Sequence, residues 1–207
     1  MTRRSPSRQA AKPRASARGF SLVEALVVVG VVLAGLAMAL PVLSQAADAA
    51  EAAAAARWLA GRVAIARATA ARERRTIALR FSDGDPVAFD TVADGDGDGV
   101  SAADVAAGID PVVRAGERVD QHFPRVRFGV GRALPAIDEA RLLAPGDDAV
   151  RFGAANQLSL TPVGTASGGT AYLVSRGGRQ YAVRISGVTA RARVLRYEPG
   201  DGGWRTW

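Results

Sequence analysis

A single carboxylate stands inside the longest apolar segment of the chain. Residues 20–40, FSLVEALVVVGVVLAGLAMAL, contain Glu24 as their only charged side chain. A charged side chain at mid-bilayer costs about 2.5–3.5 kcal/mol on insertion scales, so an acid in such a segment usually has a function. In a low-dielectric surrounding, a carboxylate paired with an ammonium group is penalised much less than an unpaired one. We therefore expect Glu24 to have a cationic partner.

A second set of carboxylates lies in the hexapeptide DGDGDG, residues 94–99. The hexapeptide resembles the start of an EF-hand-type calcium loop. Position 12 of such a loop should be a bidentate acid, but here Val105 occupies position 12 and Asp104 lies one place earlier. Calcium takes six to eight oxygens, which these carboxylates and one backbone carbonyl do not supply. A calcium site and a solvated Asp-Gly turn both remain open as interpretations. The match covers positions 1, 3, 5 and 6 of the loop, which are Asp94, Asp96, Asp98 and Gly99, with Asp104 as the fourth candidate ligand.

The C-terminal segment, residues 151–207, is basic and interleaves arginines with aromatic side chains. Arginine can bind phosphates and aromatic rings can stack on bases, so nucleic-acid binding is one interpretation. In the alternative, alternate arginines cover the solvent face of strands while the aromatic rings pack inward. The residues concerned are Arg176, Arg179, Arg184, Arg191, Arg193, Arg196 and Arg205, with Tyr172, Tyr181, Tyr197, Trp204 and Trp207.

No catalytic constellation stands out in the sequence. His122 is the single histidine, so a histidine-based metal cluster or triad lacks parts. The pairs Asp138-Glu139 and Asp147-Asp148 are adjacent acids without the facing arrangement that general acid and base catalysis needs. The chain has no cysteine, which excludes disulfides and a thiolate nucleophile. We expect a structural protein and no enzyme, with no cofactor unless calcium binds.

The charge distribution and the apolar segment together predict a membrane anchor. Residues 1–19 contain six basic residues and no acid, whereas residues 83–150 are strongly acidic. As a helix, residues 20–40 span about 31 Å, close to a hydrocarbon core of about 30 Å. The positive-inside rule leaves residues 1–19 in the cytoplasm and sends everything after Leu40 outward.

The elements beyond the anchor predict an α+β fold. Pro41 should stop or kink a helix, yet residues 42–75 remain Ala-rich and helix-favouring, so we expect one long kinked helix. Its predicted buried stripe contains Leu43, Ala47, Ala50, Ala54, Trp58, Leu59, Val63 and Ala66. From Thr76 the period changes to two, and strands are expected at 76–81, 87–89, 126–130, 150–152, 158–160, 171–175, 180–185, 191–197 and 204–207. Short turns, including a hairpin at Gly177-Gly178, predict antiparallel sheet packed on the helix.

Three simpler explanations compete for the N-terminal segment. A secretory signal could be cleaved at SQA, residues 44–46, but its apolar core would be 7–15 residues long and contain no glutamate. Arg3-Arg4 suggests a twin-arginine signal, but Pro6 stands where an apolar side chain is favoured. A plain single-span anchor explains the length of the segment but neither Gly19-Phe20 nor Glu24.

These residues resemble the type IV prepilin signature: a basic leader ending in glycine, a phenylalanine, an apolar stretch and a glutamate at the fifth mature position. Gly19, Phe20 and Glu24 occupy those places, and Pro41 falls where many pilins carry a helix-bending proline. The resemblance implies that a membrane prepilin peptidase cuts between Gly19 and Phe20 and methylates the amino group of Phe20. That group, with an ordinary pKa of about 7.7–8.0, would be the cationic partner of Glu24 in a neighbouring subunit.

The C-terminal part looks like the GspH/FimT family of minor pseudopilins and minor pilins. The resemblance lies in SLTPVGTASGGTAYL (159–173) and YAVRISGVTARARVLRY (181–197), although the family's usual Thr-Gly-Arg reads Thr189-Ala190-Arg191. It implies a pilin-like fold and a minor pseudopilin of a type II secretion system in the bacterial inner membrane. Its domain would face the periplasm, and it would pack through its helix on other pseudopilins in a periplasmic pseudopilus.

Two other functions remain open beside the secretion pseudopilin. One is a FimT-like minor pilin of a type IV pilus, for which the resemblance implies DNA contact through Arg191 and Arg193. The other is a stand-alone anchored β-domain that binds calcium or another ligand. The expected organisation is a cleaved leader (1–19), the transmembrane part of the helix (20–41), its periplasmic part (42–75), and a β-rich domain (76–207) with an acidic insertion around 83–148.

Overall fold

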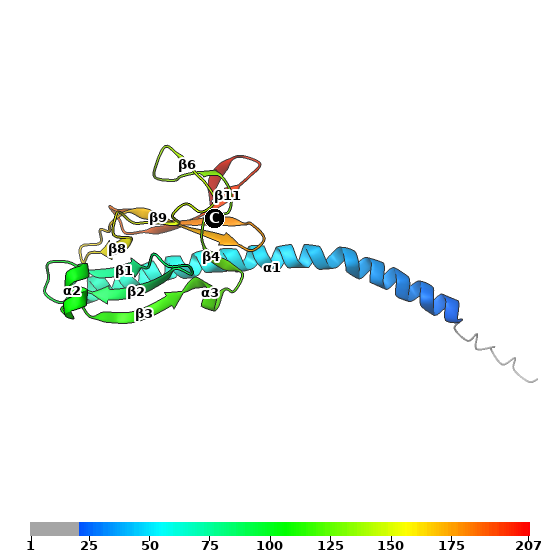
Figure 1. The fold of residues 1–207 in the computed structure, drawn as a ribbon, viewed down its shortest axis with the longest axis horizontal. Helices are drawn as coiled ribbons and strands as arrows, with labels where there is room; N and C mark the ends of the chain where they lie inside the picture. Colours follow the sequence, from blue (N-terminus) through cyan, green and yellow to red (C-terminus); the bar gives the residue numbers. More distant parts are fainter. Residues whose placement is uncertain (1–20) are drawn as a thin grey trace, which may run out of the picture. The chain divides into compact units, whose positions relative to one another are not determined.

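The computed structural model describes residues 21–207, except for the side chains of residues 38–40. It divides the chain into two compact units, residues 1–42 and 43–207. One helix, α1 (Leu22–Glu73), belongs in part to each unit, and all the strands belong to the second (Figure 1). The molecule is therefore α+β, with antiparallel sheets, as the sequence predicts.

Helix α1 runs through Pro41 and ends two residues earlier than predicted. Its second half is rich in alanine, the residue with the highest helix propensity, and tertiary packing stabilises the helix further. Arg74 follows the last helical residue with a φ of 56°, in the left-handed region that commonly ends helices. The chain then turns directly into the first strand.

A four-stranded antiparallel sheet has the strand order β3-β2-β1-β8. One of its two central strands, β1, is the strand that the period of two predicts after Thr76. The expectation that it is half-buried is wrong, because Ala78 on its predicted outer face is also fully buried. The edge strand β3 was missed by the sequence analysis, because its side chains are mostly exposed and show no alternation. The strands are β1 (Ile77–Phe81), β2 (Ala88–Ala93), β3 (Val112–Arg118) and β8 (Gln157–Leu160).

A second antiparallel sheet has the order β12-β11-β10-β9-β4, and β7 also pairs with β9. The predicted hairpin at Gly177-Gly178 is confirmed, since it joins β9 to β10. A short additional ribbon, β5 (Leu134–Pro135) with β6 (Leu142–Leu143), was not predicted. The strands of the second sheet are β4 (Val126–Phe128), β7 (Val150–Arg151), β9 (Gly169–Ser175), β10 (Gln180–Ile185), β11 (Ala192–Glu198) and β12 (Gly203–Thr206).

Two short helices in the acidic middle of the chain were also missed. Helix α2 (Ala102–Ala107) has Ser101 as its N-cap and Gly108 in a left-handed C-cap. Helix α3 (Val119–His122) is a single turn. Both are too short for a 3.6-residue period to emerge from the sequence.

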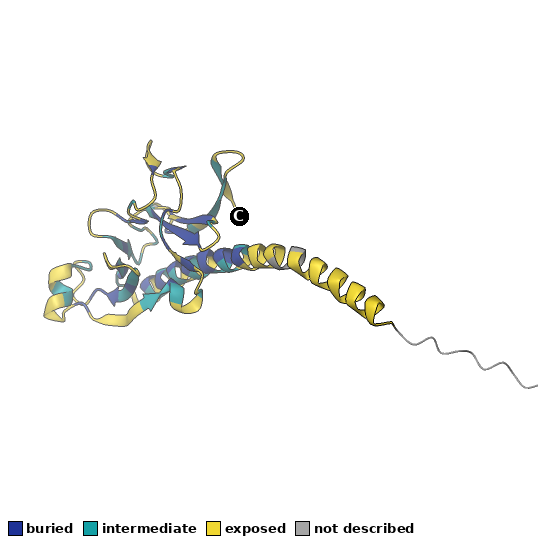
Figure 2. Ribbon diagram, turned by 45° about the vertical axis from the view of Figure 1, so that its right-hand side comes forward, coloured by how far each residue is buried: buried dark blue, intermediate teal, exposed yellow. Residues whose placement is uncertain are grey.

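The second half of α1 supplies one side of the hydrophobic core, whose other side comes from strands of both large sheets (Figure 2). The predicted stripe is correct from Leu59 through Val63 to Ala66. Trp58 is half-buried and packs against the core, and Ala54 is half-buried. The stripe is wrong at its start, because Leu43 is 64% exposed and Ala47 and Ala50 are also exposed. The buried residues of the helix are Asp48, Ala52, Ala53, Ala55, Ala56, Leu59, Val63, Ala66 and Ala70.

Candidate functional site

The first half of α1 is an apolar helix with an exposed surface. The exposed fractions of Leu22 and Leu36 are 77% and 52%, and the large apolar side chains described between them are also exposed. The helix is long and apolar enough to cross a membrane. Membrane attachment through a single span is consistent with this, as expected from the sequence.

Glu24 lies in the first turn of this helix, where its backbone N–H donates to the hydroxyl of Ser21 at 3.3 Å. Its carboxylate is exposed and has no ion pair or hydrogen bond with any residue between 21 and 207. The predicted processing residues, Gly19 and Phe20, lie outside the described residues. The expected cationic partner of Glu24 is thus not among the residues that the structure describes.

The aspartates of the Asp-Gly loop converge at the end of β2. Carboxylate oxygens of Asp94, Asp96 and Asp98 lie within 4.8 Å of one another. Asp94 is almost fully buried and accepts hydrogen bonds from the N–H groups of Gly97 (2.7 Å) and Gly99 (3.1 Å). A hydrogen bond with the Asp96 carboxyl, and then the charge of Asp96, raise the pKa of Asp98. The loop therefore collects negative charge that a cation would relieve.

The fourth candidate ligand, Asp104, is not part of this group of three. It lies in the first turn of α2, where its carboxylate accepts a 2.5 Å hydrogen bond from the Ser101 hydroxyl. The acid that closes the loop is Asp110, which is 1% exposed and accepts from Gly95 N–H at 2.9 Å and Ser101 N–H at 3.0 Å. Nothing in the local sequence distinguishes Asp110 from its acidic neighbours. Three carboxylates supply fewer than the six to eight oxygens of a calcium site, and waters or carbonyls would have to provide the rest.

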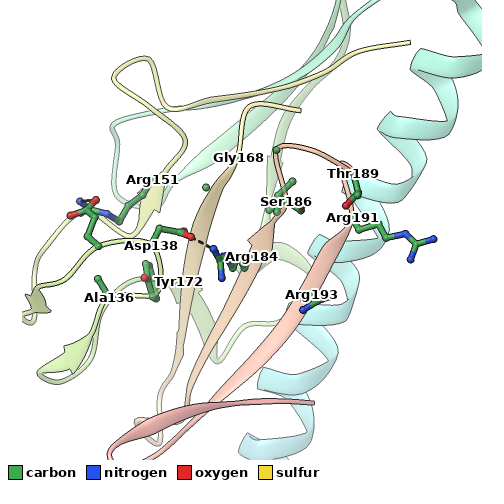
Figure 3. Close-up of a pocket in the computed structure, with 14 residues that line it drawn as sticks. Ala136, Asp138, Arg151, Gly168, Tyr172, Arg184, Ser186, Thr189, Arg191 and Arg193 are labelled. Atoms are coloured by element: carbon green, nitrogen blue, oxygen red, sulfur yellow. Dashed lines mark hydrogen bonds and ion pairs between the residues drawn. The ribbon is translucent and has the colours of Figure 1, made fainter. Parts of the chain in front are cut away.

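The predicted nucleic-acid residues Arg191 and Arg193 line a groove of about 650 Å³, which we call the C-terminal groove (Figure 3). Within it, Arg184 pairs with Asp138 at 2.9 Å and Arg151 pairs with Glu139 at 2.5 Å. Arg191 and Arg193 make no ion pair with any residue in the described part of the chain, and both are exposed. The groove therefore contains two neutralised guanidinium groups and two free ones.

The aromatic rings of the C-terminal segment mostly pack inward. Tyr172 and Tyr181 are 1% and 2% exposed. The hydroxyl of Tyr172 accepts from Ile137 N–H at 3.0 Å, and burial raises the pKa of Tyr172. Trp204 donates its indole N–H to the Pro135 carbonyl at 2.8 Å. These rings stabilise the domain, and they do not form a platform on which bases could stack.

The sequence departs from the GspH/FimT pattern at Ala190, but the backbone there keeps a glycine-like conformation. Ala190 has a φ of 49°, in the left-handed region that usually favours glycine. Its N–H donates to the Ser186 carbonyl at 2.9 Å, and Ser186 N–H donates to the Arg191 carbonyl at 3.0 Å. These bonds close the β10–β11 turn and set the start of β11, which carries Arg193.

The remaining candidate acids and the histidine have structural contacts. His122 is exposed, with its ring 5.0 Å from that of Trp58. Asp147 accepts from Ala144 N–H at 3.1 Å, and Asp148 accepts from Val150 N–H at 2.9 Å, so both acids stabilise turns.

Comparisons of this chain with protein-family models, with curated proteins and with solved structures found no match. The family resemblance therefore rests on the residues quoted from the sequence. The function follows as a proposal from those residues and from the geometry of α1.

Proposed function

We propose that this chain is a minor pseudopilin, a structural subunit of the pseudopilus of a type II secretion system. In this proposal prepilin peptidase removes residues 1–19 and methylates Phe20, and the helix then packs against other pseudopilins. The domain of residues 43–207 faces the periplasm. One observation carries the proposal: the first half of α1 is apolar and exposed, with one acid that has no ion pair among residues 21–207, while its second half is built into a β-sheet core.

A helix with one exposed apolar half and one half packed in a core fits a subunit that moves from lipid into an assembly. The exposed apolar side chains of residues 22–36 need a cover, and either lipid tails or neighbouring helices can provide it. The alanine-rich second half cannot slide, because its side chains are locked among those of two sheets. The first half can therefore exchange lipid for neighbouring helices while the second half stays packed in the core.

Glu24 makes packing of the helix against other subunits more favourable than its exposure to lipid. In a helix, Glu24 lies about 6 Å from the start of the apolar segment, so the mid-bilayer cost of about 2.5–3.5 kcal/mol is an upper bound for its unpaired carboxylate in lipid. Removal of the leader would create an ammonium group on Phe20, which could pair with Glu24 of an adjacent subunit. The upper bound corresponds to at most roughly a hundredfold in the docking equilibrium. Proteolysis would then convert an anchored monomer into a subunit ready to assemble.

The test uses Glu24→Gln, which removes the charge and preserves the size of the side chain. We expect normal leader removal but strongly reduced incorporation into the assembly, measured by crosslinking to neighbouring subunits in the native host. Glu51→Gln is the matched control, since Glu51 is an acid on the same helix whose carboxylate binds Arg125 within the domain. That variant should assemble normally.

Processing provides a second, independent measurement. Mass spectrometry of the native protein should show a chain that begins at a methylated Phe20, and Gly19→Ala should block this maturation. A native chain that begins at Met1, or one that begins beyond Ala46, would refute the proposal. So would normal maturation of the Gly19 variant.

The C-terminal groove favours a second candidate function, a FimT-like minor pilin that contacts DNA. Its supporting observation is that Arg191 and Arg193 are exposed and make no ion pair among the described residues, whereas Arg184 and Arg151 in the same groove are neutralised. Free guanidinium groups bind phosphate oxygens in bidentate fashion. Because the neighbouring tyrosines are buried, the contact would be to the backbone and independent of sequence.

Salt dependence distinguishes this second candidate from the first. DNA binding by the full chain in micelles should fall steeply with rising salt, and the variant Arg191→Gln/Arg193→Gln should abolish it. The matched control is Arg67→Gln/Arg72→Gln, which removes the same charge from α1, outside the C-terminal groove. Absence of binding at low salt would exclude the DNA function and leave the secretion pseudopilin.

A further inference from the structure

A second basic cavity lies at the N-terminal end of the domain's helix. It has a volume of about 680 Å³ and is lined by α1 at Ser44, Gln45 and Asp48, together with the β9–β10 turn and the segment that follows β4. We call it the arginine pocket. Its basic residues are Arg125, Arg132, Arg176 and Arg179.

Most of the positive charge in the arginine pocket is not neutralised. Arg125 forms an ion pair with Glu51 at 3.8 Å. The other three arginines are exposed and form no ion pair with any residue of the described chain. The one acid that lines the cavity, Asp48, is committed to the Ser175 hydroxyl at 2.5 Å and Gly177 N–H at 3.0 Å. Like charges gathered in a concave surface attract and concentrate anions.

Two buried polar side chains hold the walls of the pocket in place. Asp48 fixes the β9–β10 turn to the helix, and a Cβ atom at Gly177 would come within 2.5 Å of its carboxylate. Gln180 is 2% exposed, accepts from Gly131 N–H at 2.9 Å and donates to the Gly129 carbonyl at 2.8 Å. The turn that carries Arg176 and Arg179 is therefore tied to the segment that carries Arg132. These hydrogen bonds fix the backbone around the pocket before any ligand binds.

The chain itself limits how far the pocket can lie from the membrane. Ser44 is four residues beyond Leu40, the end of the apolar segment. Four residues cover about 6 Å as a helix and at most about 14 Å when fully extended. The polar head-group layer occupies about 5–8 Å on each side of the hydrocarbon core. If the proposed membrane anchoring holds, the wall of the pocket stands at or just outside the head groups whatever the orientation of the domain.

We propose that the arginine pocket binds the phosphate diester of an anionic phospholipid head group. The guanidinium groups of Arg176, Arg179 and Arg132 would receive the phosphate oxygens, with charge-assisted and bidentate hydrogen bonds. The bound head group would hold the domain against the membrane before assembly, and packing against other subunits would replace it. This inference rests on the anchoring part of the proposed function and on no step of processing or assembly.

The test titrates the full chain in nonionic detergent micelles with a short-chain phosphatidylglycerol, with affinity measured by calorimetry. Each arginine near an anionic lipid surface contributes about 1 kcal/mol, so Arg176→Gln/Arg179→Gln should weaken binding about 30-fold. The matched control Arg67→Gln/Arg72→Gln loses the same charge from α1, outside both basic cavities, and should bind like the unaltered chain. Arg176→Lys/Arg179→Lys keeps the charge but loses the bidentate hydrogen bonds, so its affinity should lie between those of the unaltered chain and the glutamine pair, which shows that the pocket still folds.

Further titrations separate the alternative ligands. Phosphatidylcholine, which carries no net charge, should bind much more weakly than phosphatidylglycerol. Equal affinity for free glycerol phosphate would overturn the lipid assignment in favour of a soluble phosphate, and preferential binding of a short acidic peptide would overturn it in favour of a protein partner. Equal weakening by both glutamine pairs would also refute the site. The micelle titration does not depend on Glu24, so its result and that of the incorporation test can differ.

Discussion

Asp48 connects the membrane-proximal end of the domain's helix to the β9–β10 turn, and its removal should destabilise the domain. It is 6% exposed, and its two carboxylate oxygens accept from Ser175 and Gly177, which lie 127 and 129 residues further along the chain. The Ser175 hydroxyl also accepts from Arg179 N–H at 3.0 Å. The substitution Asp48→Ala leaves both donors of the turn without this acceptor.

The expected size of the effect follows from these contacts. A hydrogen bond to a charged group contributes about 1.5–3 kcal/mol. Because the arginine pocket beside Asp48 is open to solvent, water can replace part of each bond, and we expect a loss of about 3 kcal/mol in the free energy of unfolding. For a domain of this size such a loss lowers the melting temperature by about 6–12 °C. A double-mutant cycle with Ser175→Ala should give a coupling energy of about 1–2 kcal/mol.

Urea unfolding of the full chain in nonionic micelles measures this loss. Tryptophan fluorescence reports on the domain alone, because Trp58, Trp204 and Trp207 all lie between residues 43 and 207. Asp201→Ala is the control, since Asp201 is 53% exposed and should change stability by less than about 0.5 kcal/mol. A loss below about 1 kcal/mol for Asp48→Ala, or a coupling energy of zero, would refute the role of Asp48 as an anchor.

Three further predictions, two of them with a control substitution, concern local features of the fold. Arg74→Gly should stabilise the domain by about 1 kcal/mol, because Arg74 is in the left-handed conformation that glycine adopts without strain. The control Arg72→Gly, within the last helical turn, should destabilise the domain by about 1 kcal/mol. Equal effects of the two substitutions in urea unfolding would contradict this prediction. Gly95→Ala should lower the free energy of unfolding by more than about 2 kcal/mol, because the added Cβ atom would lie 1.9 Å from the Ile109 carbonyl oxygen. The control Gly84→Ala, whose Cβ atom would have its nearest neighbour at 3.8 Å, should be close to neutral in the same assay. The raised pKa of Asp98 means that the folded state holds a proton more readily than the unfolded state, so stability falls as pH rises through the window between the ordinary and the raised pKa. Without calcium, Asp98→Asn should therefore raise the melting temperature at neutral pH, with a difference that shrinks below that window; a lower melting temperature at neutral pH would contradict the repulsion.

The fold class and most elements could be predicted from the sequence because they depend on local patterns. The change of period at Thr76 indicated the central strand of one sheet, and the Gly177-Gly178 pair indicated the hairpin of the other. Strand β3 could not be predicted, because an exposed edge strand gains its hydrogen bonds from β2 and needs no alternation of its own. The helical stripe was wrong at Ala47 and Ala50 because alanine fits either face of a helix, and only the facing sheets decide which alanines are buried.

The candidate sites, like the fold, depend partly on local sequence and partly on tertiary contacts. By itself, the sequence determined the apolar segment, its lone Glu24 and the three alternating aspartates, since each is a matter of residue type and spacing within one segment. Only the tertiary structure decided that Asp110 closes the Asp-Gly loop, that Asp48 holds the β9–β10 turn, and that arginines from separate segments share one pocket. These contacts join residues far apart in the chain, and no local period or propensity encodes them. They exist because the tertiary fold brings the segments together and buries Asp48 and Asp110, whose carboxylates then accept hydrogen bonds from the chain itself.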